Sequence, residues 1–135
     1  MQILAFDFGI KKIGVAVGQT STYTSSPLLI IKNKDGKVNW EEINKLINEW
    51  KPELIIIGKP LNMDGTDSEI MKKVDRFFKK LKSLHHARYE YIDERLTTFE
   101  AKQILAENKN NNIDANAAKI LIENWFEINL SLIHI

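Results

Sequence analysis

The stretch that decides the fold is "LAFDFGIKKIGVAVG", residues 4 to 18. Apolar residues flank the turn "GIKK" on both sides, which predicts an antiparallel hairpin with strands Ile3 to Phe8 and Ile13 to Gly18. Asp7 does not fit the first strand, because an ionised carboxylate buried there costs at least about 2 kcal/mol unless something pairs with it. The hairpin therefore raises the question of what Asp7 faces.

The rest of the chain alternates between strand and helix patterns. "PLLIIKN" from Pro27 predicts a third strand, closed by the turn Asp35-Gly36. Two further strands, 53 to 58 and 88 to 93, each follow a helical pattern, so right-handed crossovers would make them parallel members of the same sheet. We expect an α/β fold in one domain, 1 to 135, with a mixed five-stranded sheet, the first strand at its centre and helices covering it.

Helix starts are indicated by capping boxes, in which an Asn or Thr is followed three residues later by Glu. This pattern predicts helices that begin near Asn39 (with Glu42), Thr66 (with Glu69) and Thr97 (with Glu100). A last helix is predicted from near Asp114 to about Leu130.

Composition excludes several classes of protein. The chain of 135 residues has 44% hydrophobic and 27% charged residues, which is typical of one globular domain. It has no cysteine, which excludes disulfides and thiolate metal sites. No apolar run approaches the roughly 18 residues of a membrane span and no signal pattern opens the chain, so we expect a cytoplasmic location and no membrane partner.

Charge is unevenly distributed along the chain. Residues 71 to 88 carry seven cations and one anion, whereas residues 89 to 135 carry four cations and eight anions. Such a run is usually a solvated helix face, and charge alone favours that interpretation. The alternative is a surface that contacts a phosphate backbone beside an acidic site.

Acidic residues follow strands that end at the same edge of the predicted sheet. Asp7 ends the first strand, and Asp93 and Glu94 follow the last, at the edge where open α/β sheets bind ligands. Asp114 shares a helix stripe with Ala118, Leu121 and Trp125, so we expect it to point inward at this rim, although it could simply be an N-cap. His85, His86 and His134 fit surface positions better than ligand positions.

Clustered carboxylates repel one another, and a divalent cation relieves that repulsion. Oxygen ligands without cysteine or clustered histidine favour Mg²⁺ or Mn²⁺ over zinc. Two such ions about 4 Å apart can activate a water molecule and stabilise the leaving oxygen of a phosphodiester.

Four motifs resemble, in order, those of the YqgF/RuvX family: "DFGIKKIGVAVG", "GKPLNMDGT", "DERLTT" followed by "EA", and "IDANAAKIL". The resemblance covers residue 3 to about 125. It implies an RNase H-like fold with strand order 3-2-1-4-5. It also implies a nuclease that processes the 5′ end of precursor 16S ribosomal RNA in ribosome biogenesis. Members of the family are often described as Holliday junction resolvases.

The resemblance places the catalytic acids, which are also the metal ligands, at Asp7, Glu94 and Asp114, with Asp93 the weaker member of its pair. It favours the phosphate-contact interpretation of the basic helix. The residues expected to bind nucleic acid are Lys11, Lys12, Lys59, Asn62, Lys72, Lys73, Arg76 and Arg95. Three positions depart from the family's usual residues: Lys12 stands where Arg is usual, Lys59 where an apolar residue is usual, and Gln19 where Asp is common. None of these changes removes an expected metal ligand.

The expected partners are precursor rRNA, ribosomal precursor particles or branched DNA, bound by a monomer or weak homodimer. A non-catalytic nucleic-acid-binding module is an alternative, which the three acids disfavour. An actin-like or sugar-kinase ATPase would need two such domains, and 135 residues supply one.

Overall fold

The computed structural model describes residues 1–62, 64–94 and 114–130. In chain order the elements are β1 (Gln2–Phe8), β2 (Lys12–Gln19), β3 (Thr24–Lys32), α1 (Trp40–Trp50), β4 (Leu54–Lys59), α2 (Met71–Leu84), β5 (Arg88–Asp93) and α4 (Asp114–Leu130). None of the helices in these residues has the length and apolar character needed to cross a membrane.

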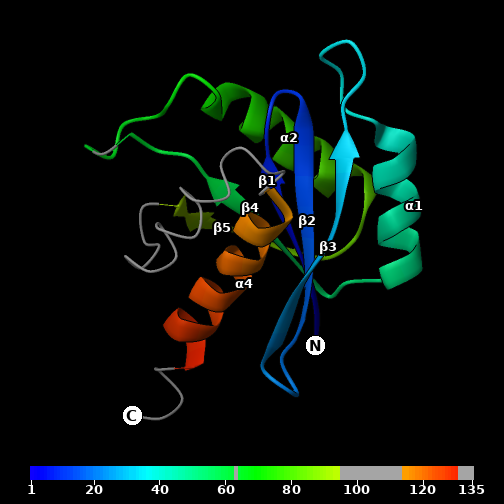
Figure 1. Cartoon of the computed structure of the whole chain (residues 1–135), viewed down its shortest axis with the longest axis vertical. Coiled ribbons are helices and arrows are strands. Elements are labelled where there is room, and N and C mark those ends of the chain that lie inside the picture. The colour runs from blue at the N-terminus through cyan, green and yellow to red at the C-terminus, as the bar shows by residue number, and fades with distance from the viewer. Residues whose placement is uncertain (63, 95–113, 131–135) are drawn as a thin grey trace.

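The five strands form one mixed sheet in the order β3-β2-β1-β4-β5 (Figure 1). The meander β1–β2–β3 is antiparallel, whereas β4 lies parallel to β1 and β5 parallel to β4. This confirms the predicted fold class, the central position of the first strand and the strand order that the family resemblance implies.

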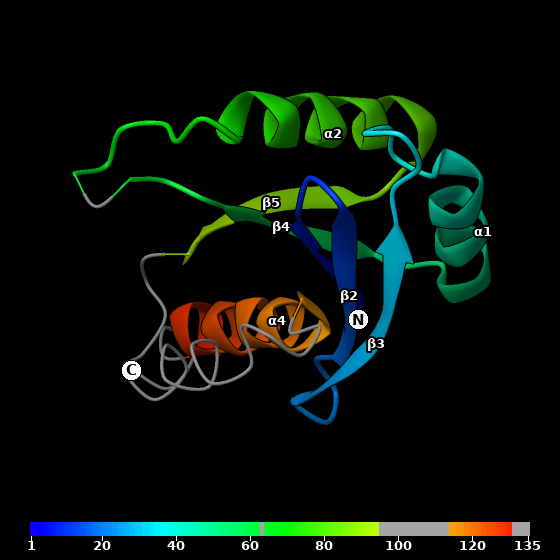
Figure 2. The ribbon, with the colours of Figure 1, turned by 45° about the horizontal axis from the view of Figure 1, so that its top comes forward.

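Helices cover both faces of the sheet, α1 and α2 on one side and α4 on the other (Figure 2). Leu4 and Phe6 of β1 are fully buried in the core under α1 and α2, while Ile3 and Ala5 are fully buried under α4. Because side chains alternate along a strand, each position can be assigned to one face. The odd-numbered residues of β1 and the even-numbered residues of β4 and β5 point towards α4.

Several local expectations are confirmed. The Asn39 side chain accepts a hydrogen bond from the Glu42 amide at 3.3 Å, which caps α1. The backbone amide of Gly9 donates to the Lys12 carbonyl at 2.9 Å and closes the first hairpin. Helix α4 has the predicted bounds, and its stripe residues Ala118 and Leu121 are buried against the sheet.

The predicted start of α2 at Thr66 is wrong, because the helix begins at Met71 with Ile70 as N-cap and no side-chain cap. Thr66 instead belongs to a turn, where its amide and hydroxyl both donate to the Asp64 carboxylate, at 3.0 and 2.6 Å. The Asp64 side chain thus bonds the backbone that a capping box would have used.

Strand β3 begins at Thr24 rather than at Pro27. The polar segment "TSS" pairs with the end of β2 through its backbone, and the register shifts where Pro27 meets Ala16. Proline is tolerated there because β3 is an edge strand. The helix predicted from Thr97 lies outside the described residues.

Candidate active site

Asp7 lies near the carboxyl end of β1, on the face of the sheet that α4 covers. Its neighbours Phe6 and Phe8 both pack on the opposite face, so alternation turns the half-buried Asp7 side chain towards α4. The last β1–β4 pair is Phe6 with Ile57, and the next residues along these parallel strands are Asp7 and Gly58. Asp7 therefore sits beside Gly58 at the rim of the sheet.

Glu94 reaches the same place from β5. It directly follows the strand, and its half-buried carboxyl folds back over Gly58 and hydrogen-bonds the carboxyl of Asp7. A Cβ atom at position 58 would collide with Oε1 of Glu94. Gly58 therefore leaves the space in which carboxyls from two non-adjacent strands meet across the strand between them.

The alternation of β5 separates the two adjacent acids. Asp93 pairs with Lys59 in the β4–β5 register and belongs to the face covered by α2, whereas Glu94 contacts Asp7 on the α4 face. The structure thus brings Glu94, the residue that the family resemblance favours, together with Asp7.

The electrostatics of this pair are compatible with a shared proton or a bound cation. Burial raises the pKa of the Glu94 carboxyl, the hydrogen bond from Asp7 opposes that rise, and the negative charge of Asp93 adds to it. Two carboxyl groups in contact must share a proton or be neutralised by a positive charge. Their oxygen atoms are the donors that Mg²⁺ prefers, commonly one or two protein carboxylates completed by waters and phosphates.

Asp114 is the first residue of α4, and only its backbone is described. Leu121, two turns further along the same stripe, lies over Gly58: its Cδ1 would be 3.1 Å from a Cβ placed there. Within residues 1–62, 64–94 and 115–129, whose side chains are described, no three acidic or histidine side chains group into a metal site. A third ligand from Asp114 therefore stays a prediction.

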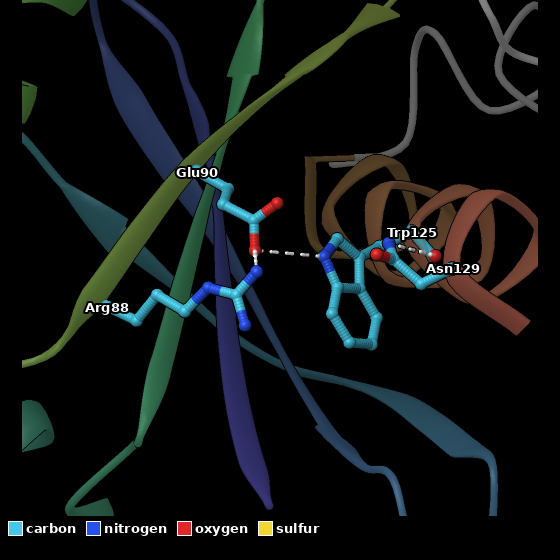
Figure 3. Close-up of polar contacts among 4 residues, drawn as sticks. All are labelled: Arg88, Glu90, Trp125 and Asn129. Carbon is cyan, nitrogen blue, oxygen red and sulfur yellow. Dashed lines mark hydrogen bonds and ion pairs between the residues drawn. The ribbon is translucent and has the colours of Figure 1, made fainter.

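The position of α4 over the sheet is fixed by a polar contact to β5 (Figure 3). The indole Nε1 of Trp125 donates to Oε2 of Glu90 at 3.2 Å, and Arg88 pairs with the same oxygen at 3.1 Å. Asn129 in turn donates to the Trp125 carbonyl at 2.8 Å. Trp125, predicted only as part of an apolar stripe, thus also hydrogen-bonds across the face that carries the carboxyl pair.

The residues predicted to bind nucleic acid are distributed over both faces. Lys11 is exposed in the hairpin after Asp7, and Lys12 is half-buried at the start of β2. Lys59 lies on the α2 face, with its Nζ 5.6 Å from the centre of the Tyr91 ring, and is therefore separated from the carboxyl pair by the sheet. Arg95 lies outside the described residues.

Asn62 holds the loop after β4 in shape. Its side-chain amide donates to Oγ1 of Thr66 and to the carbonyl of Asp67, both at 3.1 Å. The remaining predicted contacts, Lys72, Lys73 and Arg76, are exposed on α2. These residues stay predictions for nucleic-acid binding.

Comparison with known proteins identifies the family of this chain. A family model described as "RuvX: Holliday junction resolvase" matches residues 1–128. The chain belongs to the RuvX family. A relative from Buchnera aphidicola subsp. Baizongia pistaciae is 48% identical over 132 residues, covering 93% of this chain and 96% of its own length. One from Shewanella denitrificans is 44% identical over 131 residues, covering 93% of each chain. Both relatives are provisionally named pre-16S rRNA nucleases.

Solved structures share the fold of this RuvX chain. Thermus thermophilus RuvC in complex with a Holliday junction substrate matches with a TM-score of 0.61 at 12% identity, over 95% of this chain and 96% of its own. The fowlpox virus Holliday junction resolvase matches with a TM-score of 0.55 at 16% identity, over 96% and 99%. At these identities the likeness establishes the fold alone.

Proposed function

We propose that this chain is a metal-dependent nuclease that hydrolyses phosphodiester bonds and trims the 5′ end of precursor 16S rRNA in the cytoplasm. The observation that carries the proposal is the contact between the carboxyls of Asp7 and Glu94 across Gly58. A half-buried pair of contacting acids is costly to keep in a fold, and the carboxyl ends of parallel strands, where this pair lies, are where such sheets bind ligands.

Asp7, Glu94 and Asp114 would hold Mg²⁺ or Mn²⁺. When bound, the ion supplies Lewis-acid stabilisation of the charge that develops on the phosphate and favours ionisation of the attacking water. The carboxylates would fix the position of that charge at the rim of the sheet. Lys11 and Lys12, in the hairpin that follows Asp7, would bind the phosphates of the substrate strand.

The substrate assignment rests on the relatives. Those named as pre-16S rRNA nucleases are similar along nearly their whole length, at 42–48% identity. The family description favours a second candidate, resolution of Holliday junctions. Symmetric cleavage of a four-way junction would require a dimer, whereas trimming an RNA end would need only the monomer.

A cleavage assay with a precursor 16S 5′ end and a synthetic four-way junction, each with Mg²⁺ or Mn²⁺, tests the proposal. We expect cleavage of the RNA by the wild type and a loss of at least a hundredfold in Asp7→Asn, Glu94→Gln and Asp114→Asn. Asp93→Asn is the matched control, because it removes a neighbouring carboxylate from the other face of the sheet and should keep most of the activity.

Cleavage at the wild-type rate by a nuclease-free preparation of Asp7→Asn would overturn the catalytic assignment. Cleavage of the junction in preference to the RNA would favour the resolvase. Binding of nucleic acid without turnover in either metal would favour a non-catalytic module.

A further inference from the structure

A groove lies on the face of the sheet opposite the carboxyl pair, between α2, the start of α1 and the end of β1. We call it the aromatic groove. Its volume is about 210 Å³, below the roughly 300–1,000 Å³ of a pocket for a drug-sized ligand, so it suits one planar group. Its lining consists of Phe8, Gly36, Val38, Trp40, Lys73, Arg76, Phe77 and Lys80.

The floor of the groove is aromatic. The ring of Phe77 lies 5.3 Å, centre to centre, from both Phe8 and Trp40, and is itself almost fully buried. Phe8 and Trp40 are only half-buried and pack against the core, so each side chain keeps some exposed surface at the groove. A partly exposed aromatic surface of this kind is a platform on which another flat ring can stack.

The rim of the groove is basic. Lys73, Arg76 and Lys80 occupy positions i, i+3 and i+7 of α2, which places all three on one stripe of the helix. Among the described residues, no acidic side chain lines the groove, and none of these three cations forms an ion pair with a carboxylate. The ammonium of Lys80 lies 4.7 Å from the centre of the Trp40 ring.

The other cations of α2 have a different environment. Lys79 pairs with Asp75 at 3.1 Å, and the hydrogen bond from Lys79, followed by that from Tyr91, holds the pKa of Asp75 below its usual value. Among the described residues, the positive charge of α2 is therefore paired with a carboxylate at Lys79, whereas the stripe that borders the aromatic groove has no such pair.

The groove adjoins the carboxyl pair through the backbone of β1. Phe8 in its floor directly follows Asp7, and the two side chains point to opposite faces at the same rim of the sheet. A strand that crosses this rim can present a phosphate on one side of it and an unpaired base on the other.

We propose that the aromatic groove is a subsite for one unpaired base of single-stranded nucleic acid next to the cleaved bond. The base stacks on Trp40 and Phe8 and displaces the Lys80 ammonium from the Trp40 ring. The flanking phosphates lie against Lys73, Arg76 and Lys80. The position of the base next to the cleaved bond rests on the proposed nuclease function, whereas the stacking of a base in the groove does not.

Binding of labelled oligothymidylate to the full chain, measured by fluorescence anisotropy in EDTA, tests the stacking without cleavage. The probe for comparison is the same oligonucleotide with abasic sites in place of its bases. The wild type should bind the thymidylate about tenfold more tightly than the abasic strand, because the loss of one stacked base has an effect of that order. Trp40→Leu should bind both strands alike.

Trp40→Leu can also weaken the core, so the rim is tested separately on the exposed surface. Arg76→Gln and Lys80→Gln should each weaken binding of both strands several-fold. Lys45→Gln is the matched control: it removes the same charge from an exposed position of α1 and should bind as the wild type does.

Equal affinity of the wild type for the two strands would overturn the proposal, as would a base preference that survives in folded Trp40→Leu. Rim variants indistinguishable from Lys45→Gln would overturn the role of α2. A preference for the strand with bases, in a chain that cleaves no nucleic acid with metal, would support the subsite and refute the nuclease. Cleavage without such a preference would support the nuclease and refute the subsite.

Discussion

The geometry of the carboxyl pair depends on the absence of a side chain at Gly58. The Glu94 carboxyl occupies the space where a Cβ would stand, and Leu121 closes that space from α4. We expect Gly58→Ala to displace Glu94 from Asp7 and to lower nuclease activity at least tenfold. Crowding should also cost about 1–3 kcal/mol of unfolding free energy, measured by chemical denaturation.

Gly18→Ala is the matched control for this substitution. Gly18 also lies under α4, where a Cβ would stand 2.8 Å from Cγ2 of Ile122, but it is at the opposite end of the strands from the carboxyl pair. It should cost comparable stability and keep the activity of the folded fraction. Equal loss of activity in both variants would show that crowding under α4, rather than the position of Glu94, is responsible.

The raised pKa of Glu94 has a consequence for stability. Because burial raises that pKa above its ordinary value of 4.5, the Glu94 carboxyl holds its proton to a higher pH in the folded chain than in the unfolded chain. The contribution of Glu94 to the free energy of unfolding should therefore fall as pH increases from about 4.5 towards the folded-state pKa of this carboxyl. Glu94→Gln should remove this decline and gain roughly 0.5–2 kcal/mol at pH 7.

Denaturation in EDTA at pH 5 and pH 7 measures this effect without metal. Glu49→Gln, which removes an exposed carboxylate from α1, is the control and should follow the wild type. If Glu94→Gln shows the same pH dependence as the wild type, the carboxyl is not held in an unfavourable environment.

At the scale of the residue, the sequence predicted that acids from separate strands meet at one rim, but not the direct contact of Asp7 with Glu94 over Gly58. Asp7 was recognisable because a carboxylate is out of place in a buried strand. Only the family resemblance favoured Glu94 over Asp93, because the strand pattern alone leaves the register of β5 undefined over six residues. Gly58 ends a continuous apolar run, and only the path of the Glu94 side chain distinguishes it from an ordinary strand-end glycine.

Helix starts show how local patterns succeed or fail. Asn39 and Thr66 are both followed three residues later by Glu, yet only Asn39 caps a helix. The Asp64-Gly65 turn, with Gly65 at a φ of 88°, binds Thr66 before a helix can begin there. A competing acceptor two residues upstream therefore decides the outcome.

The two positions should differ in stability. Asn39→Ala should cost about 1 kcal/mol of unfolding free energy, because it leaves the Glu42 amide without its side-chain acceptor. Thr66→Ala removes a hydroxyl from an exposed turn and should change stability by less than about 0.5 kcal/mol. Thermal denaturation of the two variants side by side measures this, and an equal loss would indicate that the hydrogen bonds of the Thr66 turn stabilise the fold as much as the Asn39 cap does.

At the scale of the whole molecule, the sheet separates two kinds of charge. The face under α4 holds the carboxyl pair, and the face under α2 holds the basic rim of the aromatic groove. Composition gives a net charge of only +1, which by itself predicts little affinity for nucleic acid. The architecture and the uneven charge were both predictable from the sequence. The packing of Phe8 against Phe77 of α2, which places an aromatic surface beside one basic stripe of that helix, is a long-range contact that the sequence pattern does not predict.

The salt dependence of binding distinguishes a local basic stripe from the net charge. If the cations of the groove rim contact about three phosphates, the logarithm of the affinity for single-stranded nucleic acid should fall with the logarithm of salt concentration with a slope of about −2. Lys80→Gln should reduce the magnitude of that slope by about 0.7, whereas Lys45→Gln should leave it unchanged. Titrations of labelled oligothymidylate at several salt concentrations measure the slope. A slope near zero would mean that the phosphates do not lie on α2, and an equal change in both variants would mean that the chain responds to total charge rather than to the stripe beside Trp40.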